Sequence, residues 1–212
     1  MNSPDSNRVA SANDAHPSKV GILLFDGVEV LDFAGPFEVF SVTGRLTGAF
    51  EVSTVARTTD LVIARHGLMV QPMYSIDEAP SFDLLIVPGG IMTTLLEDEL
   101  SLAFISNHHN TGHLVASVCT GAFALACIGL LANRRATTHW EDIQDLERNY
   151  PDIEVVHDVP YVDEGDIATS AGISAGIDMS LFLVERLMGK EIATATARQM
   201  QYEKGWDKEN GI

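Results

Sequence analysis

The sequence has little of several features that would assign a function at once. Only two of its 212 residues are cysteines, Cys119 and Cys127, too few for a disulfide scaffold. No uninterrupted apolar run reaches the roughly 20 residues that a membrane-spanning helix needs. Neither a Walker loop nor a G-x-G-x-x-G pattern occurs, and no histidine has metal-ligand spacing to an acid or a cysteine. We therefore expect a protein of the reducing cytoplasm that binds neither membrane nor metal and uses no cofactor.

Positive charge is also scarce. Lysine and arginine number 13 against 30 aspartates and glutamates, which gives a net charge of −17. Such a surface repels phosphate backbones, so we expect no nucleic-acid partner. The acids are concentrated in the stretch 141–166, where Arg148 is the one base. We interpret this stretch as a solvated face rather than as a partner site.

The composition is that of one soluble domain. Hydrophobic residues make up 46% and charged residues 20% of the chain, both ordinary values for a globular protein. Residues 1–18 are polar and lack the apolar core of a secretory signal, so they are predicted to be a disordered leader. We expect the domain to span residues 19–204 and a short tail to follow at 205–212.

Apolar runs of strand length alternate with segments of helical spacing. Strands are expected at Lys19–Phe25, Phe50–Ala56, Asp83–Val87, Leu114–Val118 and Ile167–Thr169, and shorter ones at Leu68–Val70 (a hairpin partner of Phe50–Ala56), Arg135–Thr138, Ile153–Val156 and Pro160–Val162. Helices are expected at Asp32–Phe40 (with Pro36 near its first turn), Thr94–His109, Gly121–Leu131, His139–Asn149, Ala175–Met188 and Lys190–Glu203. Buried strands alternating with helices predict an α/β fold whose mostly parallel sheet is covered on both faces.

A cysteine at the end of a buried strand is the strongest chemical signal. The strand Leu114–Val118 leads directly into Cys119, and small residues stand two positions before it (Ser117) and two after it (Gly121). This pattern is typical of a nucleophile elbow, a strained turn that exposes its central side chain. The helix expected to follow should lower the pKa of the thiol. Cys127 is interpreted instead as a residue packed inside that helix.

Two further features follow strands at the same edge of the sheet. Gly89 and Gly90 come directly after Asp83–Val87, and a glycine N–H there together with that of Thr120 would form a two-donor hole for an anion. The acids Glu29 and Asp32 follow the first strand.

The sequence leaves the roles of two titratable residues open. Asp32 either caps the helix that follows it or exchanges protons with a substrate. His139 is a second candidate base, but its role depends on a contact with Cys119 that spacing does not give.

Several motifs in order resemble the ThiJ/PfpI superfamily over residues 19–204: IVPGG, SVCTGA, RRATTHW and SAGISAGID. The resemblance implies the flavodoxin-like, three-layer α/β/α sandwich of class I glutamine-amidotransferase-like proteins. Within the superfamily, the segments LLFDGVEVLDFAGPFEVF and AGISAGIDMSLFLVERLMG are most similar to isonitrile hydratases. Those hydro-lyases convert R–N≡C and water to an N-substituted formamide without cofactor or metal, and are usually homodimers.

The resemblance also implies site residues. Cys119 matches the nucleophile, Asp32 the acid/base and Thr120 the residue after the nucleophile, while the anion hole and the pocket lining fall on Gly90, Ile91 and Ile173. Thr120 stands where the peptidase branch of the superfamily has histidine, which argues against proteolysis. The glycine run after Pro88 is short, which leaves the size of the pocket open.

Two alternatives remain beside the enzyme. The same domain forms the N-terminal half of AraC-type regulators, where it senses small molecules. Since this chain ends at Ile212 without room for a DNA-binding helix-turn-helix, we favour the enzyme. A stress or glyoxalase-like member of the superfamily is the third interpretation. For the enzyme we expect a small-molecule substrate and, from the many apolar helices, a homodimer.

Overall fold

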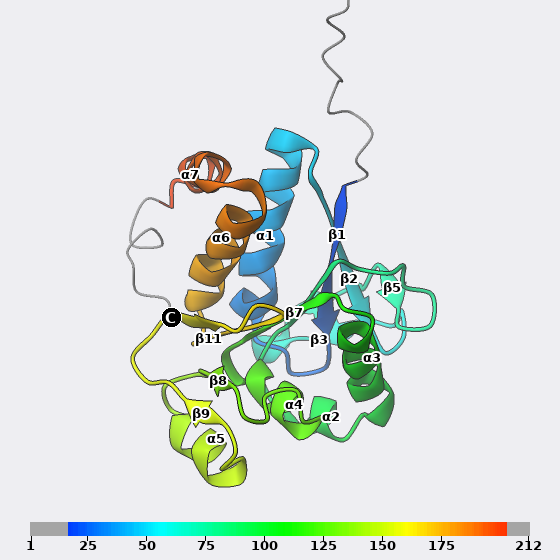
Figure 1. Cartoon of the computed structure of the whole chain (residues 1–212). Helices are drawn as coiled ribbons and strands as arrows, with labels where there is room; N and C mark the ends of the chain where they lie inside the picture. Colours follow the sequence, from blue (N-terminus) through cyan, green and yellow to red (C-terminus); the bar gives the residue numbers. More distant parts are fainter. Residues whose placement is uncertain (1–16, 203–212) are drawn as a thin grey trace, which may run out of the picture.

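A seven-stranded sheet forms the centre of the computed structural model, which describes residues 17–202 (Figure 1). Its strand order is β10-β11-β7-β6-β1-β2-β5, and only β10 runs antiparallel to its neighbour. The strands are β1 (Ser18–Leu24), β2 (Phe50–Ala56), β5 (Tyr74–Ser75), β6 (Leu84–Val87), β7 (Leu114–Val118), β10 (Tyr161–Asp163) and β11 (Ile167–Ser170). The prediction of a mostly parallel sheet is confirmed.

The central strands read as continuous apolar runs because both of their faces are covered. One row across the sheet pairs Ile22 with Ile86, Ile86 with Ala116 and Ala116 with Ala168. None of these four side chains is exposed to solvent. Strands buried on both faces lose the alternation of polar and apolar residues that one-sided strands show.

Helices cover the sheet on both sides and complete a three-layer sandwich (Figure 1). One face carries α1 (Val30–Thr47), α6 (Ala175–Met188) and α7 (Lys190–Gln199), and the other carries α2 (Thr93–Leu96), α3 (Glu99–Asn110) and α4 (Ala122–Cys127). Beyond the carboxyl ends of the strands lie α5 (Ile143–Asn149) and a small sheet of β8 (Arg135–Ala136) and β9 (Glu154–Val155). The predicted α/β/α architecture is confirmed.

The single helix expected over Thr94–His109 is wrong, because the structure divides it into α2 and α3. Asp98 lies at the break, where its carboxylate accepts hydrogen bonds from the backbone N–H groups of Leu100 at 3.2 Å and Ser101 at 3.3 Å. A side chain that caps a helix in this way starts a new helix rather than continuing the old one.

Five other predicted elements have different ends or partners. The helix after Cys119 begins as a 3₁₀ turn and stops at Cys127, and α5 begins at Ile143 rather than at His139. Helix α1 extends from Val30 to Thr47, so Pro36 lies in its interior instead of its first turn, and α7 ends at Gln199. The strand near Leu68 is β4 (Met69–Val70), and it pairs with β3 (Val62–Ile63) rather than with β2. The leader predicted for residues 1–18 and the tail at 205–212 lie almost wholly outside the described residues.

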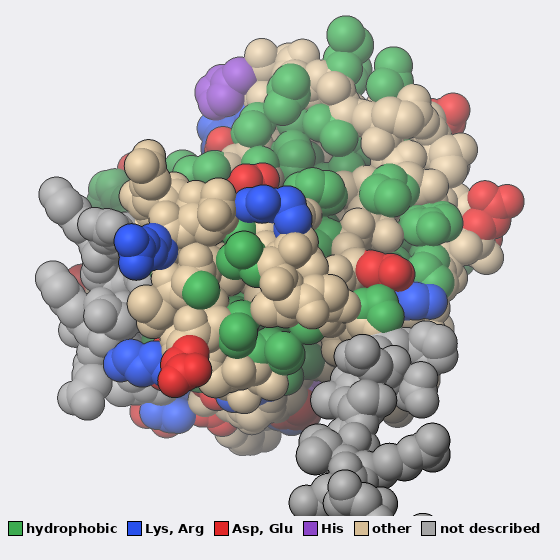
Figure 2. Space-filling view, turned by 90° about the horizontal axis from the view of Figure 1, so that it is seen from above, with side chains coloured by type: hydrophobic (Ala, Val, Ile, Leu, Met, Phe, Trp, Pro, Cys, Tyr) green, Lys and Arg blue, Asp and Glu red, His purple; other side chains and the backbone are tan. Residues whose placement is uncertain are grey.

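The surface is mixed in character. Figure 2 shows acidic, basic and apolar side chains interspersed on the face seen from above. The acidic stretch 141–166 includes α5 and β9, which lie at the lower end of the molecule in Figure 1. Among residues 17–202, no helix combines the length and the hydrophobicity needed to cross a membrane.

Candidate functional site

Cys119 occupies a strained turn between β7 and α4. Its φ angle is +56°, a left-handed conformation that residues other than glycine seldom adopt. The 3₁₀ turn over Cys119–Gly121 brings Gly121 against the end of the neighbouring strand β6, where an added Cβ would lie 2.1 Å from the carbonyl oxygen of Val87. The Thr138 hydroxyl fixes the turn by donating a 2.8 Å hydrogen bond to the Cys119 carbonyl. The elbow and its need for a small residue at position 121 are therefore present.

A pocket of about 300 Å³ opens beside the thiol. Seven of the eight residues proposed from the sequence line it, together with three that were not proposed: Glu29, Gly90, Ile91, Cys119, Thr120, His139 and Ile173, and then Arg65, Glu141 and Asp142. Asp32 is the exception, because it is fully buried. It lies behind the backbone of Gly89, whose N–H donates to Asp32 Oδ2 at 3.0 Å.

The surroundings of Asp32 favour the protonated form of its carboxyl group. Its second oxygen, Oδ1, is buried and has no hydrogen-bond partner among the described residues. Burial, reinforced by the neighbouring charge of Glu29, raises the pKa of the Asp32 carboxyl to about 7, against the opposing effects of the Gly89 N–H, the Cys119 thiol and Arg65. A carboxyl with such a pKa can both take up and release a proton near neutral pH.

The capping alternative for Asp32 is wrong. The residue that caps α1 is Glu29, whose Oε1 accepts a hydrogen bond from the N–H of Val30 at 3.2 Å. Asp32 lies one turn further along, where its carboxylate turns away from the helix end toward Gly89. Asp32 is therefore not the cap of α1.

The expected activation of Cys119 by a helix dipole is also wrong. Burial, and next the charge of Asp32, raise the pKa of the Cys119 thiol well above its ordinary value. The helix that follows is only six residues long. The free-energy cost of burying a thiolate exceeds the stabilisation that the dipole of this short helix gives to the thiolate. Two titratable side chains lie near this thiol, Asp32 and His139.

The glycine half of the expected anion hole is occupied by the protein itself. The N–H of Gly90 donates to the Thr120 hydroxyl at 2.9 Å, and that of Gly89 is taken by Asp32. Gly90 has a φ of +141°, and an added Cβ would lie 2.3 Å from the carbonyl oxygen of Gly27, so only glycine fits there. For Gly90 to stabilise a developing anion, the Thr120 hydroxyl has to turn away from it.

The structure places His139 beside the thiol. An added Cβ on Gly172 would lie 2.3 Å from His139 Cδ2 and 2.7 Å from Cys119 Sγ, so the imidazole and the sulfur flank the same glycine. The other side of the ring faces an acid, with Nδ1 3.3 Å from Asp142 Oδ2. Ile173 follows Gly172 at the mouth of the pocket and is 37% exposed.

Arg65 is the main site residue that sequence reasoning missed. It lies in the 3₁₀ turn between β3 and β4, and its Nη1 is 3.1 Å from Glu29 Oε2. Neither a strand end nor a motif marks this position, and only the folded hairpin brings it to the pocket.

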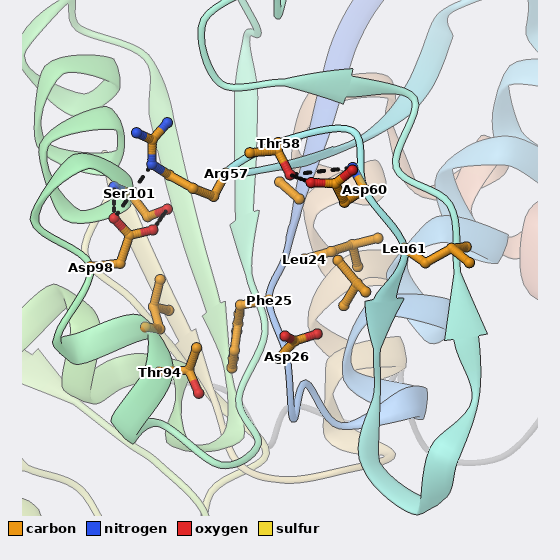
Figure 3. Close-up of a pocket in the computed structure, with 13 residues that line it drawn as sticks. Leu24, Phe25, Asp26, Arg57, Thr58, Asp60, Leu61, Thr94, Asp98 and Ser101 are labelled. Carbon is orange, nitrogen blue, oxygen red and sulfur yellow. Dashed lines mark hydrogen bonds and ion pairs between the residues drawn. The ribbon is translucent and has the colours of Figure 1, made fainter.

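A second, larger cavity of about 400 Å³ lies at the ends of β1 and β2, between the hairpin and α3 (Figure 3). Its rim carries Arg57, whose Nε is 3.8 Å from Asp98 Oδ1. No cysteine or histidine lines it. Within the described part of the chain, no three His, Cys, Asp or Glu side chains are grouped so that they could hold a metal ion.

A family comparison agrees with this geometry. The model of the DJ-1/PfpI family matches residues 18–186, which include β1, the elbow and most of α6. The chain belongs to the DJ-1/PfpI family. The resemblance to ThiJ/PfpI proteins noted from the sequence motifs is thereby confirmed.

Relatives within the DJ-1/PfpI family have different activities. The isonitrile hydratase of Pseudomonas putida is 36% identical over 185 residues, covering 87% of this chain and 78% of that enzyme. The HTH-type transcriptional regulator GbdR of Pseudomonas aeruginosa is 28% identical over 89% of this chain. The match covers 52% of GbdR, so the chain spans about half the length of that regulator. A ThiJ/PfpI family protein from Pseudomonas syringae superposes with a TM-score of 0.79 at 26% identity, covering 96% of this chain and 83% of that one.

Gly172 gives a direct test of how closely His139 and Cys119 are packed around it. Gly172→Ala should slow alkylation of Cys119 by iodoacetamide roughly tenfold or more, because the new methyl group must displace the sulfur or the imidazole and small misplacements of reacting groups are costly. The rate is measured by mass spectrometry in a Cys127→Ala background. Ser174→Ala, an exposed position whose side chain makes no capping hydrogen bond, is the control and should react at the parent rate. A Gly172→Ala protein that reacts equally fast would show that the two groups are not packed tightly against Gly172.

Proposed function

We propose that this DJ-1/PfpI family member hydrates isonitriles to N-substituted formamides through a covalent intermediate on Cys119. The observation that carries the proposal is the strained Cys119 beside a buried carboxyl, Asp32, whose pKa is raised to about 7. Similarity to the isonitrile hydratase of Pseudomonas putida supports the choice of substrate class. An isonitrile suits such a pair because its terminal carbon is divalent and accepts both a nucleophile and a proton.

In the first step one carboxyl moves one proton. Ionised Asp32 takes the proton from Cys119 as Sγ forms a bond to the isonitrile carbon, and then delivers that proton to the same carbon. The triple bond becomes C=N, and the product is a thioimidate, R–N=CH–S–Cys119. Since Asp32 first receives and then releases the proton, its pKa near neutrality serves both halves of the step.

In the second step water adds to the thioimidate carbon. Asp32, ionised again, takes one proton from the water and passes it to the nitrogen, which leaves a tetrahedral carbon bearing OH, NHR and sulfur. Collapse breaks the C–S bond and forms C=O, and Asp32 carries the hydroxyl proton to the sulfur. The products are R–NH–CHO and the free thiol, so no cofactor is consumed.

The test is direct. Incubation with a small alkyl isonitrile should release the corresponding formamide over many turnovers, followed by proton NMR, and intact-mass spectra of quenched samples should show one thioimidate adduct. Protein denatured before the incubation serves as the control. A native protein that forms no formamide above this control would refute the proposed activity.

The runner-up is a small-molecule sensor, and one observation favours it. The Gly90 N–H, expected to stabilise a developing anion, is bonded to the Thr120 hydroxyl, which suits a pocket that binds without turnover. The similarity to GbdR belongs with this alternative. A sensor would bind its ligand stoichiometrically and release no formamide.

A homodimer is proposed for either function. Apolar side chains exposed on the β3–β4 hairpin, such as Ile63 at 55% and Met69 at 66%, are consistent with a homodimer.

A further inference from the structure

The β3–β4 hairpin is fastened to the loop that leads into α1. Asp26 Oδ1 accepts a hydrogen bond from the N–H of Ile63 at 2.8 Å, and Gly27 donates to the Ile63 carbonyl at 2.8 Å. Figure 3 shows Asp26 at the end of β1 with the hairpin beside it. The N–H of Arg65 then donates to the Val28 carbonyl at 2.9 Å. These bonds fix where the Arg65 side chain enters the Cys119 pocket.

Glu29 is the group that Arg65 meets there. The Glu29 residue is only 9% exposed, and within residues 17–202 Arg65 is the one cation paired with it. Its Oε1 is fixed by the Val30 N–H at the start of α1. Glu29 is thus held as a nearly buried carboxylate one helical turn from Asp32, and two such carboxylates repel unless one of them is neutralised.

We propose that Arg65 is a positioning residue that acts through Glu29: the ion pair neutralises Glu29 and so allows Asp32 to ionise beside Cys119. The inference rests on the proposed role of Asp32 in hydration, but its test needs no turnover. The geometry agrees with the electrostatics, because Glu29 raises the pKa of Asp32 whereas Arg65 lowers it.

Other groups also face Asp32. Gly89 donates a hydrogen bond to it, and the Cys119 thiol lies against it from the elbow. Across the pocket, beyond the sulfur, stand His139, Glu141 and Asp142. Substitution of Arg65 or Glu29 leaves these groups in place, so a change in the titration of Asp32 reports the ion pair alone.

The experiment titrates Asp32 directly. Protein labelled with ¹³C at the aspartate carboxyl is titrated by NMR, and the Asp32 signal is assigned by its loss in Asp32→Asn. Arg65→Gln should raise the midpoint of Asp32 by roughly one pH unit, the lower end for a nearby charge. Glu29→Gln should lower it, and the double variant should return close to the parent value because the pair is removed as a whole. Arg65→Lys, which keeps the charge, should rescue the midpoint.

A matched control and a second measurement separate the possible outcomes. Arg57→Gln removes an arginine of similar exposure that faces Asp77 and Asp98 instead, and it should leave the Asp32 midpoint unchanged. In a Cys127→Ala background, the pH dependence of Cys119 alkylation should move with the Asp32 midpoint. The inference would be overturned if Arg65→Gln left the Asp32 midpoint unchanged. It would also be overturned if the double variant shifted that midpoint as far as Arg65→Gln does. Failure of isonitrile hydration is judged separately, from formamide release, and would leave this titration valid.

Discussion

Cys119→Ala should abolish formamide release, whereas Cys127→Ala should keep most of the rate. The nucleophile forms the bond to substrate, and water in the same pocket does not replace a positioned thiol at a useful rate. Cys127 ends α4 and does not line the Cys119 pocket, so its loss removes no reacting group. Rates are measured by NMR for both variants and the parent, with circular dichroism to confirm that each is folded.

The two thiols differ in exposure, and the sequence predicted the opposite order. Cys127 is exposed and Cys119 is buried, although the apolar run around Cys127 indicates a packed residue. Cys127 should therefore be alkylated first at neutral pH, because the raised pKa of Cys119 keeps that thiol protonated. Equal losses of activity in the two folded variants would contradict the assignment of Cys119 as the one essential thiol.

The sheet could be predicted from the sequence because its strands are buried on both faces. Segments such as Leu114–Val118 consist almost wholly of apolar residues in sequence. The structure has this strand with the bounds that were predicted. Helix ends were less predictable, since they depend on single side chains. Asp98 caps the start of α3, and nothing in local spacing distinguishes this aspartate from others on a polar helix face.

The site was predictable where a residue follows a strand. Cys119, Gly90 and Asp32 come after three parallel strands, and the shared edge of the sheet brings them together. Arg65 was missed because it lies on a hairpin of two-residue strands, which carries no pattern. The direction of the shift in the pKa of Cys119 was also missed, because it depends on burial, which is a property of the packed structure.

Asp32→Asn should reduce formamide release at least about a hundredfold, the low end for a lost general acid, without loss of folding. The amide keeps an oxygen that can accept the hydrogen bond from Gly89 but cannot exchange protons. The pH profile of the rate should lose the limb near pH 7 that belongs to this carboxyl. An Asn variant with parent activity and an unchanged profile would return Asp32 to a structural role and make Glu29 the next candidate.

The same substitution should also change how stability depends on pH. The pKa of Asp32 rises from 3.8 to about 7 in the folded protein, so between these values the folded state holds a proton that the unfolded state releases. The free energy of unfolding therefore falls as the pH rises from about 4 to about 7, and above pH 7 this group causes no further loss.

Asp32→Asn removes that loss and should be more stable than the parent at pH 8, by a few kcal/mol at most, and close to the parent in stability at pH 4. Urea unfolding at the two pH values measures the difference, and a stability difference between variant and parent that is the same at pH 4 and pH 8 would show that Asp32 is ionised at no cost in the folded protein. A gain in stability with a loss of turnover is the result expected of a carboxylate that is retained for chemistry.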